Sequence, residues 1–321
     1  MSVPVLLQAL QAAGGDDVAW LALADALEEQ DDPRAELVRL TAWLRRHPDD
    51  GDERTQKQDR LQALLRGGLR PLVPERTIAR GVRLVLVPPG VFWMGARDKE
   101  EHAHADERPR HLVEITRPFW LGATHVTQRQ YESLMGRNPS SFVRGSTLYA
   151  IPHRSTRDYP VDGVSQEDAA AFCAALSAEE GRTIRLPTEA EWEHACRAGM
   201  ATVFHVGDAI TSDAANFDGN YPYGGAEKGP YHYRTGPVGS YPPNAFGLFD
   251  MHGQLWEWCS DRYSPGYYAR SPSADPKGPR GGGNRVMRGG SWIDASWNVR
   301  CAVRRGTEPL HYVGLRVAMD A

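Results

Sequence analysis

Cysteine is scarce in this sequence, and its cysteines are never closely spaced. The four cysteines, Cys173, Cys196, Cys259 and Cys301, lie far apart, and no CxxC pair occurs. This spacing excludes a zinc knuckle and a thioredoxin-type motif, because both need paired cysteines. We therefore expect buried, reduced thiols that pack as small hydrophobic side chains.

An excess of basic charge and long apolar runs are missing as well. The formal net charge is −4, the sequence pI is about 6.3, and no basic block interrupts the chain, which excludes a nucleic-acid partner on electrostatic grounds. No apolar run reaches the length of a membrane span, and the start at Met1–Pro4 lacks the pattern of a secretion signal. We expect a cytoplasmic protein without a membrane partner.

What is present describes an ordinary folded protein. The chain has 321 residues, of which 41% are hydrophobic and 24% charged, so it can form one large domain and a small one. Residues 1–70 predict a small all-helical domain, with apolar residues at helical spacing over Val5–Ala13 and Trp20–Leu27. Asp32-Pro33 predicts the start of a third helix, and a weaker helix is expected over Arg60–Arg66.

Part of this helical region carries a resemblance of its own. The run ADALEEQDDPRAELVRL is similar to the repeat-companion-type domain found at the N-termini of some bacterial multidomain proteins. It contains no catalytic constellation. The resemblance implies at most a docking or adaptor role, in which the N-terminal helices recruit a partner.

The character of the chain changes after an expected linker at residues 71–79. The run VRLVLVPPGVFWMG predicts two strands around a turn at Pro88–Gly90, and helices are expected near Gln128–Met135 and Gln166–Glu180. After Glu193 about 100 residues are rich in loops. Such a long irregular stretch is usually held by bound ions or by buried polar anchors, and both alternatives stay open.

Several sequence blocks are spread over residues 80–321: FWMG at 92–95, VT at 126–127, RLPTEAEWE at 185–193, PPNAFGL at 242–248, GQLWEW at 253–258 and RGGSW at 288–292. Together these blocks resemble one known family, the formylglycine-generating (sulfatase-modifying factor) enzymes. The resemblance implies an α+β domain, the formylglycine-generating-enzyme-type C-type lectin fold, with little regular secondary structure. In this fold Trp256, Trp258 and Trp292 are expected as core anchors, and Thr188 with Glu191 has capping-box spacing.

The resemblance also implies structural calcium. One family site would use the carboxylates of Asp250 and Glu257 with the carbonyls of Gly253 and Leu255, a mixture of hard oxygen ligands that calcium prefers. The other would use Asn216 and the Phe217 carbonyl, but the family's acidic position there falls on Pro230. The alternative is that Asp250 and Glu257 only bind loop amides.

The same resemblance argues against the family's chemistry. Its enzymes oxidise a substrate cysteine with copper held by two thiolates, and both positions fall in the interval 293–300, which contains no cysteine here. No catalytic residue and no copper are therefore expected. Cys301 corresponds to a later, non-catalytic cysteine that pairs in secreted relatives with the counterpart of Cys196, so we expect these two to be neighbours. A second family disulfide is excluded because Cys173 would face Val317.

A dense histidine cluster gives an alternative metal centre. His102, His104, Asp106 and His111 are residue types that bind transition metals, although the surrounding sequence DKEEHAHADERPRH is typical of a charged, exposed loop. A catalytic ion would require these side chains to converge on one point. The sulfoxide-synthase relatives place iron-binding histidines on an added helical domain, and residues 1–46 contain none.

The remaining candidate is the C-terminal surface. The family includes the variable proteins of diversity-generating retroelements, whose C-terminal segment varies exposed residues on a fixed scaffold. The positions expected to be exposed here are Ile293, Asp294, Ala295, Ser296, Trp297, Asn298, Thr307, Glu308, Leu310, His311 and Tyr312. Exposed aromatic residues among small polar ones are typical of recognition surfaces.

Two functions follow from the sequence. The first is a non-catalytic C-type-lectin-like domain that binds a protein or other ligand through this surface. The alternative is a metal-dependent oxidoreductase of the formylglycine-generating or sulfoxide-synthase type. The two functions can be distinguished by whether metal-binding side chains converge at an accessible point, as the oxidoreductase requires.

Overall fold

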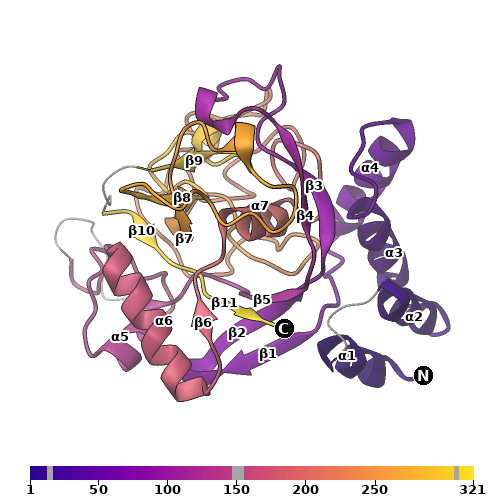
Figure 1. Ribbon diagram of the computed structural model, residues 1–321, viewed down its shortest axis with the longest axis horizontal. Helices are drawn as coiled ribbons and strands as arrows, with labels where there is room; N and C mark the ends of the chain where they lie inside the picture. The colour runs from indigo at the N-terminus through magenta and orange to yellow at the C-terminus, as the bar shows by residue number, and fades with distance from the viewer. Residues whose placement is uncertain (13–16, 147–154, 307–310) are drawn as a thin grey trace.

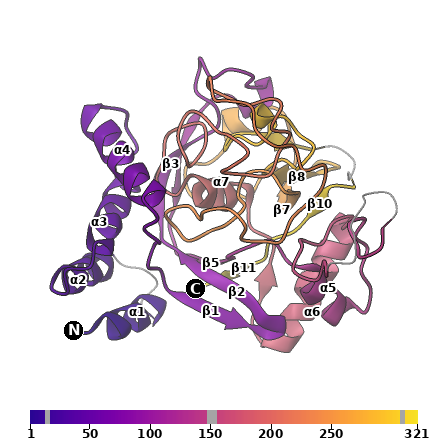
Figure 2. The ribbon, with the colours of Figure 1, turned by 180° about the vertical axis from the view of Figure 1, so that it is seen from behind.

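The computed structural model describes residues 1–12, 17–146, 155–306 and 311–321. Helices α1 to α4 lie along one flank of a larger body that is built from short strands, three more helices and long loops (Figure 1). Helices α5 and α6 lie at the opposite end of that body (Figure 2). Within the described residues, no helix is long and apolar enough to cross a membrane.

The N-terminal helices are α1 (Val3–Ala12), α2 (Asp17–Glu28), α3 (Arg34–Leu44) and α4 (Asp52–Arg66). The predicted start of α3 is confirmed within one residue, and the Asp32 carboxylate accepts the Arg34 N–H at 2.9 Å. Helix α4 begins earlier than the predicted Arg60, because its first turns are polar and carry no apolar pattern to reveal them.

These helices are joined to the body by apolar and polar contacts. Leu37, Leu44 and Leu61 belong to the same buried cluster as residues of the body. Arg45, at the end of α3, links the two parts by hydrogen bonds: its carbonyl accepts the Val91 N–H at 2.8 Å, and its guanidinium donates to the Pro89 carbonyl at 2.8 Å. Helices α3 and α4 therefore share a core with the body.

The body contains three sheets. The five-stranded sheet has the order β1 (Glu75–Ile78), β2 (Val82–Val87), β5 (Phe119–Gly122), β11 (Ala318–Asp320), β6 (Ile184–Arg185). The four-stranded sheet has the order β10 (Val313–Gly314), β7 (Trp256–Arg262), β8 (Arg285–Arg288), β9 (Arg304–Arg305), and β3 (Gly90–Met94) pairs with β4 (His111–Ile115). The expected linker at 71–79 thus includes the edge strand β1.

The two strands predicted around Pro88–Gly90 are both present, but they do not pair with each other. Strand β2 lies between β1 and β5, whereas β3 pairs with β4. The Pro88-Pro89 pair thus connects two sheets, and the strand after it bonds to the N-terminal helices through Val91. A proline pair cannot continue a strand ladder, because proline has no N–H to donate.

The helices of the body begin at side-chain caps that the sequence encodes. Helices α5 (Gln128–Met135) and α6 (Gln166–Glu180) have the predicted bounds, with Thr127 and Ser165 as N-caps. In α7 (Glu189–Arg197) Thr188 accepts the Glu191 N–H at 3.1 Å and Glu191 accepts the Thr188 N–H at 2.8 Å, which confirms the capping box. Trp192 on α7 is fully buried.

Buried polar anchors hold the loop-rich part of the body. Residues 198–255 contain no helix or strand, and one-turn 3-10 helices (Ala79–Gly81, Ala105–Glu107, Tyr268–Arg270 and Ser296–Asn298) lie in connections. Arg288 pairs with Glu193 and also donates to the carbonyls of Ala302, Val303 and Cys301 at 2.5 to 2.8 Å. The same pattern recurs at buried Arg300, Arg304 and Arg316. Of the two predicted alternatives, polar anchors are thus present.

Arg316 allows a direct test of these anchors. Its guanidinium contacts both carboxylate oxygens of Glu257 at 3.0 Å, and both side chains are buried. We expect Arg316→Met to lower the free energy of unfolding by about 3–5 kcal/mol, because Glu257 would stay buried without a counter-charge. Urea denaturation measures this change.

The exposed ion pair between Arg129 and Asp158, at 2.8 Å, provides the matched control. Arg129→Met should cost less than about 1 kcal/mol, because solvent screens that pair. The double variant Arg316→Met with Glu257→Gln should recover part of the loss. Equal losses in the Arg316→Met and Arg129→Met variants would contradict a structural role for the buried pair.

Candidate functional site

The chain that follows β8 places an aromatic side chain at the edge of the core. Trp292 is buried, and its ring contacts Phe142 and Tyr312 edge-on, with ring centroids 5.4 and 5.5 Å away. Trp256 and Trp258 are buried as well, so all three tryptophans expected as core anchors are confirmed in that role. Trp292 fixes where the following loop leaves the body.

Asp294 organises that loop. Its carboxylate accepts hydrogen bonds from Trp256 Nε1 at 2.9 Å, from Ser291 N and Oγ at 3.0 and 2.6 Å, and from Asn298 Nδ2 at 3.3 Å. All of these donors are close in space only when the loop is folded. Asp294 thus stabilises the loop from within and has little capacity left for a ligand.

The predicted surface residues divide into four groups. Ile293 and His311 are exposed, whereas Ser296 is fully buried beneath the loop and cannot contact a ligand. Partly exposed positions are Asp294, Ala295, Trp297, Asn298 and Tyr312. Thr307, Glu308 and Leu310 lie outside the described residues.

A second loop, residues 217–236, joins this surface and was not predicted from the sequence. Backbone hydrogen bonds from Asp218 N to the Asp294 carbonyl and from Ser296 N to the Tyr221 carbonyl, at 2.9 and 3.2 Å, hold the two loops side by side. Gly219 permits close packing within the second loop, since a Cβ there would lie 2.4 Å from the carbonyl oxygens of Gly229 and Pro230. The cluster of tyrosines in this loop is the sequence feature that could have predicted its place in the surface.

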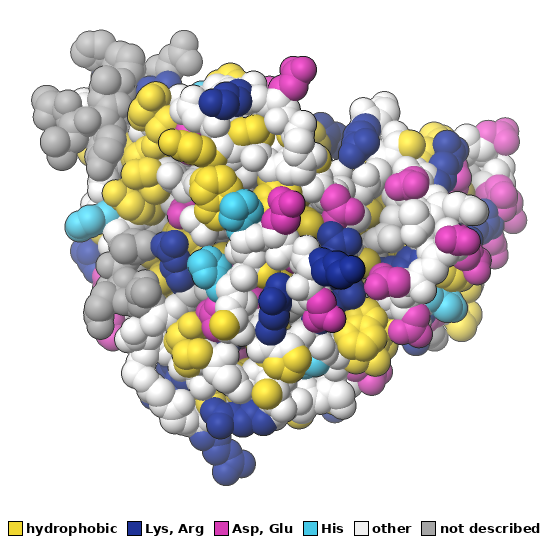
Figure 3. Space-filling view, turned by 90° about the horizontal axis from the view of Figure 1, so that it is seen from above, with side chains coloured by type: hydrophobic (Ala, Val, Ile, Leu, Met, Phe, Trp, Pro, Cys, Tyr) yellow, Lys and Arg dark blue, Asp and Glu magenta, His cyan; other side chains and the backbone are white. Residues whose placement is uncertain are grey.

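These tyrosines complete what we call the aromatic surface: Tyr221, Tyr231, Tyr233, Ile293, Trp297 and Tyr312. Tyr221 and Tyr233 are 53% and 64% exposed. Tyr231 packs against Tyr233 with ring centroids 3.9 Å apart and continues toward Trp292. Hydrophobic side chains gather toward the end of the upper face that lies away from α1–α4 (Figure 3).

The histidine cluster of the sequence does not form a metal centre in the described part of the chain. His102 stacks on Trp297 with ring centroids 4.7 Å apart, and His111 packs against Tyr268. His104 caps a one-turn helix, while Asp106 accepts the Tyr263 hydroxyl at 2.7 Å. These side chains do not converge on one point, because each has a separate local partner.

At the first expected calcium site, Glu257 already has several donors. Its carboxylate binds Arg316, the Trp192 indole N–H at 3.0 Å and His125 at 3.2 Å. Although burial opposes ionisation, the charge of Arg316 holds the pKa of Glu257 below its usual value. Burial lowers the pKa of His125 to about 4, so this imidazole is neutral.

Asp250 and Asn216 differ from Glu257 in having unused oxygens. One Asp250 carboxylate oxygen accepts the Gly239 N–H at 2.6 Å, whereas its Oδ1 and the Oδ1 of Asn216 are buried without a hydrogen-bond partner. Burial raises the pKa of Asp250 to about 6. At Gly253 a Cβ would lie 2.1 Å from the Asn216 carbonyl oxygen, so both expected sites meet at this close backbone approach.

The cysteines follow the pattern expected from the sequence. All four are free and buried. Cys196 and Cys301 are neighbours, with their Sγ atoms 3.6 Å apart, and Cys173 lies in the same core cluster as Val317. Burial raises the pKa of Cys196 well above its usual value, and the hydrogen bond from Cys196 favours the thiolate of Cys301 against the effect of burial.

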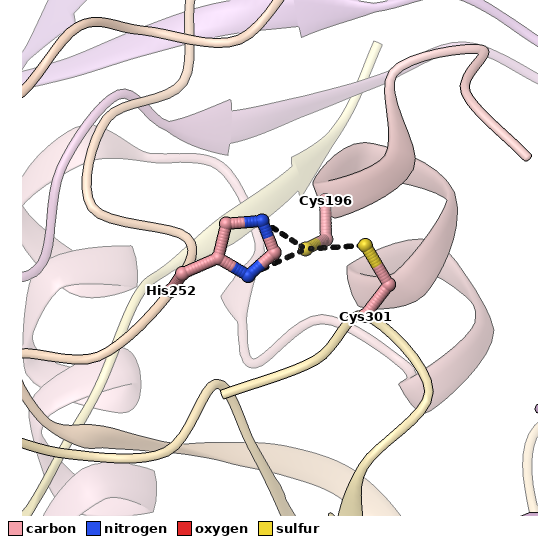
Figure 4. A group of neighbouring side chains, drawn as sticks. All are labelled: Cys196, His252 and Cys301. Carbon is pink, nitrogen blue, oxygen red and sulfur yellow. Dashed lines mark hydrogen bonds between the residues drawn. The ribbon is translucent and has the colours of Figure 1, made fainter. Parts of the chain in front are cut away.

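A histidine that the sequence reading passed over completes this cysteine pair. His252 lies beside Cys196 and Cys301 in the core (Figure 4), and its ring nitrogens are 3.9 and 4.0 Å from Cys196 Sγ. It comes from the loop before β7, so it is far from both cysteines in sequence. Only the fold brings the three together.

Comparison with solved structures supports this architecture. PvdO from Pseudomonas aeruginosa matches with a TM-score of 0.63 and 28% identity, over 77% of this chain and 97% of that one. Treponema denticola variable protein 1 matches with a TM-score of 0.62 and 23% identity, over 78% and 100% of the chains. The second likeness establishes a shared fold.

The sequence comparisons identify the family. The formylglycine-generating enzyme of Streptomyces coelicolor is 34% identical over 288 residues, which cover 74% of this chain and 89% of that protein. Some other curated relatives are longer, and the chain spans 35% and 53% of two of them. The model of the sulfatase-modifying factor enzyme 1-like domain matches residues 70–321. The chain therefore belongs to the sulfatase-modifying factor family, with a C-type-lectin-like fold preceded by four helices.

Proposed function

We propose that this protein is a non-catalytic binding module, which recognises a protein or other ligand through its aromatic surface. The observation that carries the proposal is the content of residues 293–300. The family's oxidation chemistry needs two thiolates in this interval, but the interval contains no cysteine and instead presents Ile293 and Trp297. The four cysteines of the chain are buried elsewhere.

The physical character of the surface favours recognition. Tyrosine and tryptophan provide large contact areas with few rotatable bonds, so binding costs little conformational entropy. Asp294 and Trp292 hold the loop from below, whereas Tyr233 is exposed and Trp297 is partly exposed on loops that are joined by backbone hydrogen bonds. A preformed surface of this kind loses less freedom when a ligand binds.

The proposed lack of oxidase activity has a direct test. We expect no aldehyde when the purified, reduced protein is incubated with copper and a peptide that contains the CxPxR sequence. Mass spectrometry of the peptide measures the outcome, with the Streptomyces coelicolor relative as positive control. Conversion of the peptide cysteine by this protein would overturn the non-catalytic proposal and favour the oxidoreductase alternative.

The aromatic surface predicts a partner that depends on its outward side chains. We expect a protein captured by the wild-type chain from lysate of its own source to bind at least about 30-fold more weakly to Trp297→Ala or Tyr233→Ala, as at interface hot spots. Surface plasmon resonance with the isolated partner measures this loss. Leu112→Ala changes an exposed apolar residue on β4 and serves as the matched control.

Equal affinities of all three variants would show that the partner binds elsewhere and would contradict the proposed surface.

Sequences of several alleles address the variable-protein reading separately. Differences confined to residues 293–312 would support variation for recognition, whereas differences scattered over the chain would exclude it.

We also propose calcium as a structural ion in the loops, through Asp250, Gly253, Leu255 and Glu257, and through Asn216 with the Phe217 carbonyl. The orphaned Oδ1 atoms of Asp250 and Asn216 fit this role, because a buried oxygen without a donor is costly and a cation would satisfy it. Glu257 fits less well, since Arg316 already neutralises it.

Calcium should therefore stabilise the protein through Asp250. We expect EDTA to lower the Tm, millimolar calcium to restore it, and magnesium to have little effect, because magnesium requires a smaller and more regular site. In Asp250→Asn the calcium-dependent part of the Tm should be lost, whereas Asp213→Asn, which changes a more exposed aspartate, should retain it. A Tm that is indifferent to EDTA would contradict a calcium role.

A further inference from the structure

Cys196, His252 and Cys301 form a compact group inside the core. Among the residues that the structure describes, this is the one group of three or more histidine, cysteine or acidic side chains whose ligand atoms lie close enough to hold a metal ion, all within 4.8 Å of one another. Cys196 comes from helix α7, His252 from the loop before β7, and Cys301 from the segment after the aromatic surface. The three side chains point toward one another (Figure 4).

The sulfur atoms are spaced as two ligands of one ion. A zinc or copper ion lies about 2.3 Å from a thiolate sulfur, so a tetrahedral ion would hold two sulfurs roughly 3.8 Å apart. The observed Sγ to Sγ distance is 3.6 Å. The geometry therefore needs little adjustment at the sulfurs to admit an ion between them.

His252 is oriented as metal-binding histidines usually are. Its Nδ1 lies 2.7 Å from the Val299 carbonyl oxygen, and its Nε2 accepts the His205 N–H at 3.2 Å. The Nδ1 proton is thereby fixed on the carbonyl, and a bound ion would take the Nε2 lone pair in place of the His205 N–H. A histidine that binds a metal typically donates its other N–H to just such a carbonyl or carboxylate.

The surroundings favour the thiolate form that a metal requires. Arg288 donates to the Cys301 carbonyl at 2.8 Å, and Arg197 belongs to the same helix turn as Cys196. These two buried guanidinium groups, which also pair with Glu193, place positive charge near the thiols and favour their ionisation. All three candidate ligands are at most 1% exposed, so the ion would be sealed from large substrates.

We propose that Cys196, His252 and Cys301 form a structural site for a thiophilic d10 cation, copper(I) or zinc(II). Each cysteine loses its proton to solvent when the ion binds, and no electron is transferred. The ion would join helix α7 to the loop before β7 and to the segment between β8 and β9. This site is separate from the copper chemistry of the family enzymes, whose thiolates belong to residues 293–300.

The two ions differ in what they would require. Copper(I) accepts three soft ligands, whereas zinc(II) in structural sites almost always takes four. Zinc would therefore need a fourth ligand. His205 is a candidate, because its ring stacks on that of His252 with centroids 4.8 Å apart and its Nδ1 is buried without a partner, but it lies outside the group of three and would have to turn toward the ion. The His205→Phe variant thus separates the two ions.

The test uses the full chain, unfolded with reductant and refolded without metal, with one equivalent of zinc(II), or with one equivalent of copper(I) under anaerobic conditions. We expect about one ion per chain by elemental analysis after gel filtration, and a Tm above that of the metal-free protein. X-ray absorption at the metal edge should show two sulfur and one nitrogen scatterers for copper(I), and a second nitrogen for zinc(II). Cobalt(II) provides an optical probe through its thiolate charge-transfer bands.

Matched variants identify the ligands. Cys196→Ser, Cys301→Ser and His252→Gln should each lose the bound ion, whereas Cys173→Ser, which changes a buried cysteine in another cluster, should keep it. His205→Phe should lose zinc but keep copper. Since a variant can fail to fold, the absorption spectrum of the wild-type chain stands as an independent measurement.

Three results would overturn the proposal. The first is less than about one-tenth of an equivalent of either ion after refolding. The second is an ion whose scatterers lack sulfur, and the third is an unchanged ion content in both cysteine variants. A Cys196–Cys301 disulfide in protein isolated from cells does not by itself contradict the site. It does so when the reduced, refolded chain binds neither copper(I) nor zinc(II).

Discussion

Buried guanidinium groups that bind both carboxylates and loop carbonyls are the interaction on which the rest of this structure depends. A long stretch without helix or strand leaves many backbone carbonyls unpaired, and each is costly when buried. Arg288 resolves this by pairing with Glu193 on α7 while donating to three carbonyls of residues 301–303. Removal of one partner would leave a charge without compensation, so these contacts act together.

This arrangement separates scaffold from surface. The family motifs supply the buried charges and tryptophans, and the aromatic surface is attached to them through Asp294, which accepts hydrogen bonds from Trp256, Ser291 and Asn298. An exposed position such as Ile293 can therefore change without loss of the frame. The proposed exchange of catalysis for recognition would use this separation, because the family's thiolate positions and the proposed contact side chains occupy the same interval.

Much of the fold could be predicted from sequence where local signals are strong. The ranges of α5 and α6 and the capping box at the start of α7 were predicted, and apolar runs around the proline turn located β2 and β3. The start of α4 was missed because its polar turns carry no apolar period. The residue types of the histidine cluster could not show whether its side chains converge. In the structure His102 stacks on Trp297, while His111 packs against Tyr268.

The sequence by itself determined the family, the caps of the helices, the pairing of Cys196 with Cys301 by resemblance, and the absence of cysteine from residues 293–300. Only the tertiary structure placed His252 beside that pair, joined residues 217–236 to the aromatic surface, and buried Ser296 beneath it. The sequence could not predict these placements because they depend on the long loop between α7 and β7. The path of this loop depends on distant arginines and on close backbone approaches at glycines such as Gly253. No local sequence pattern predicts either kind of contact.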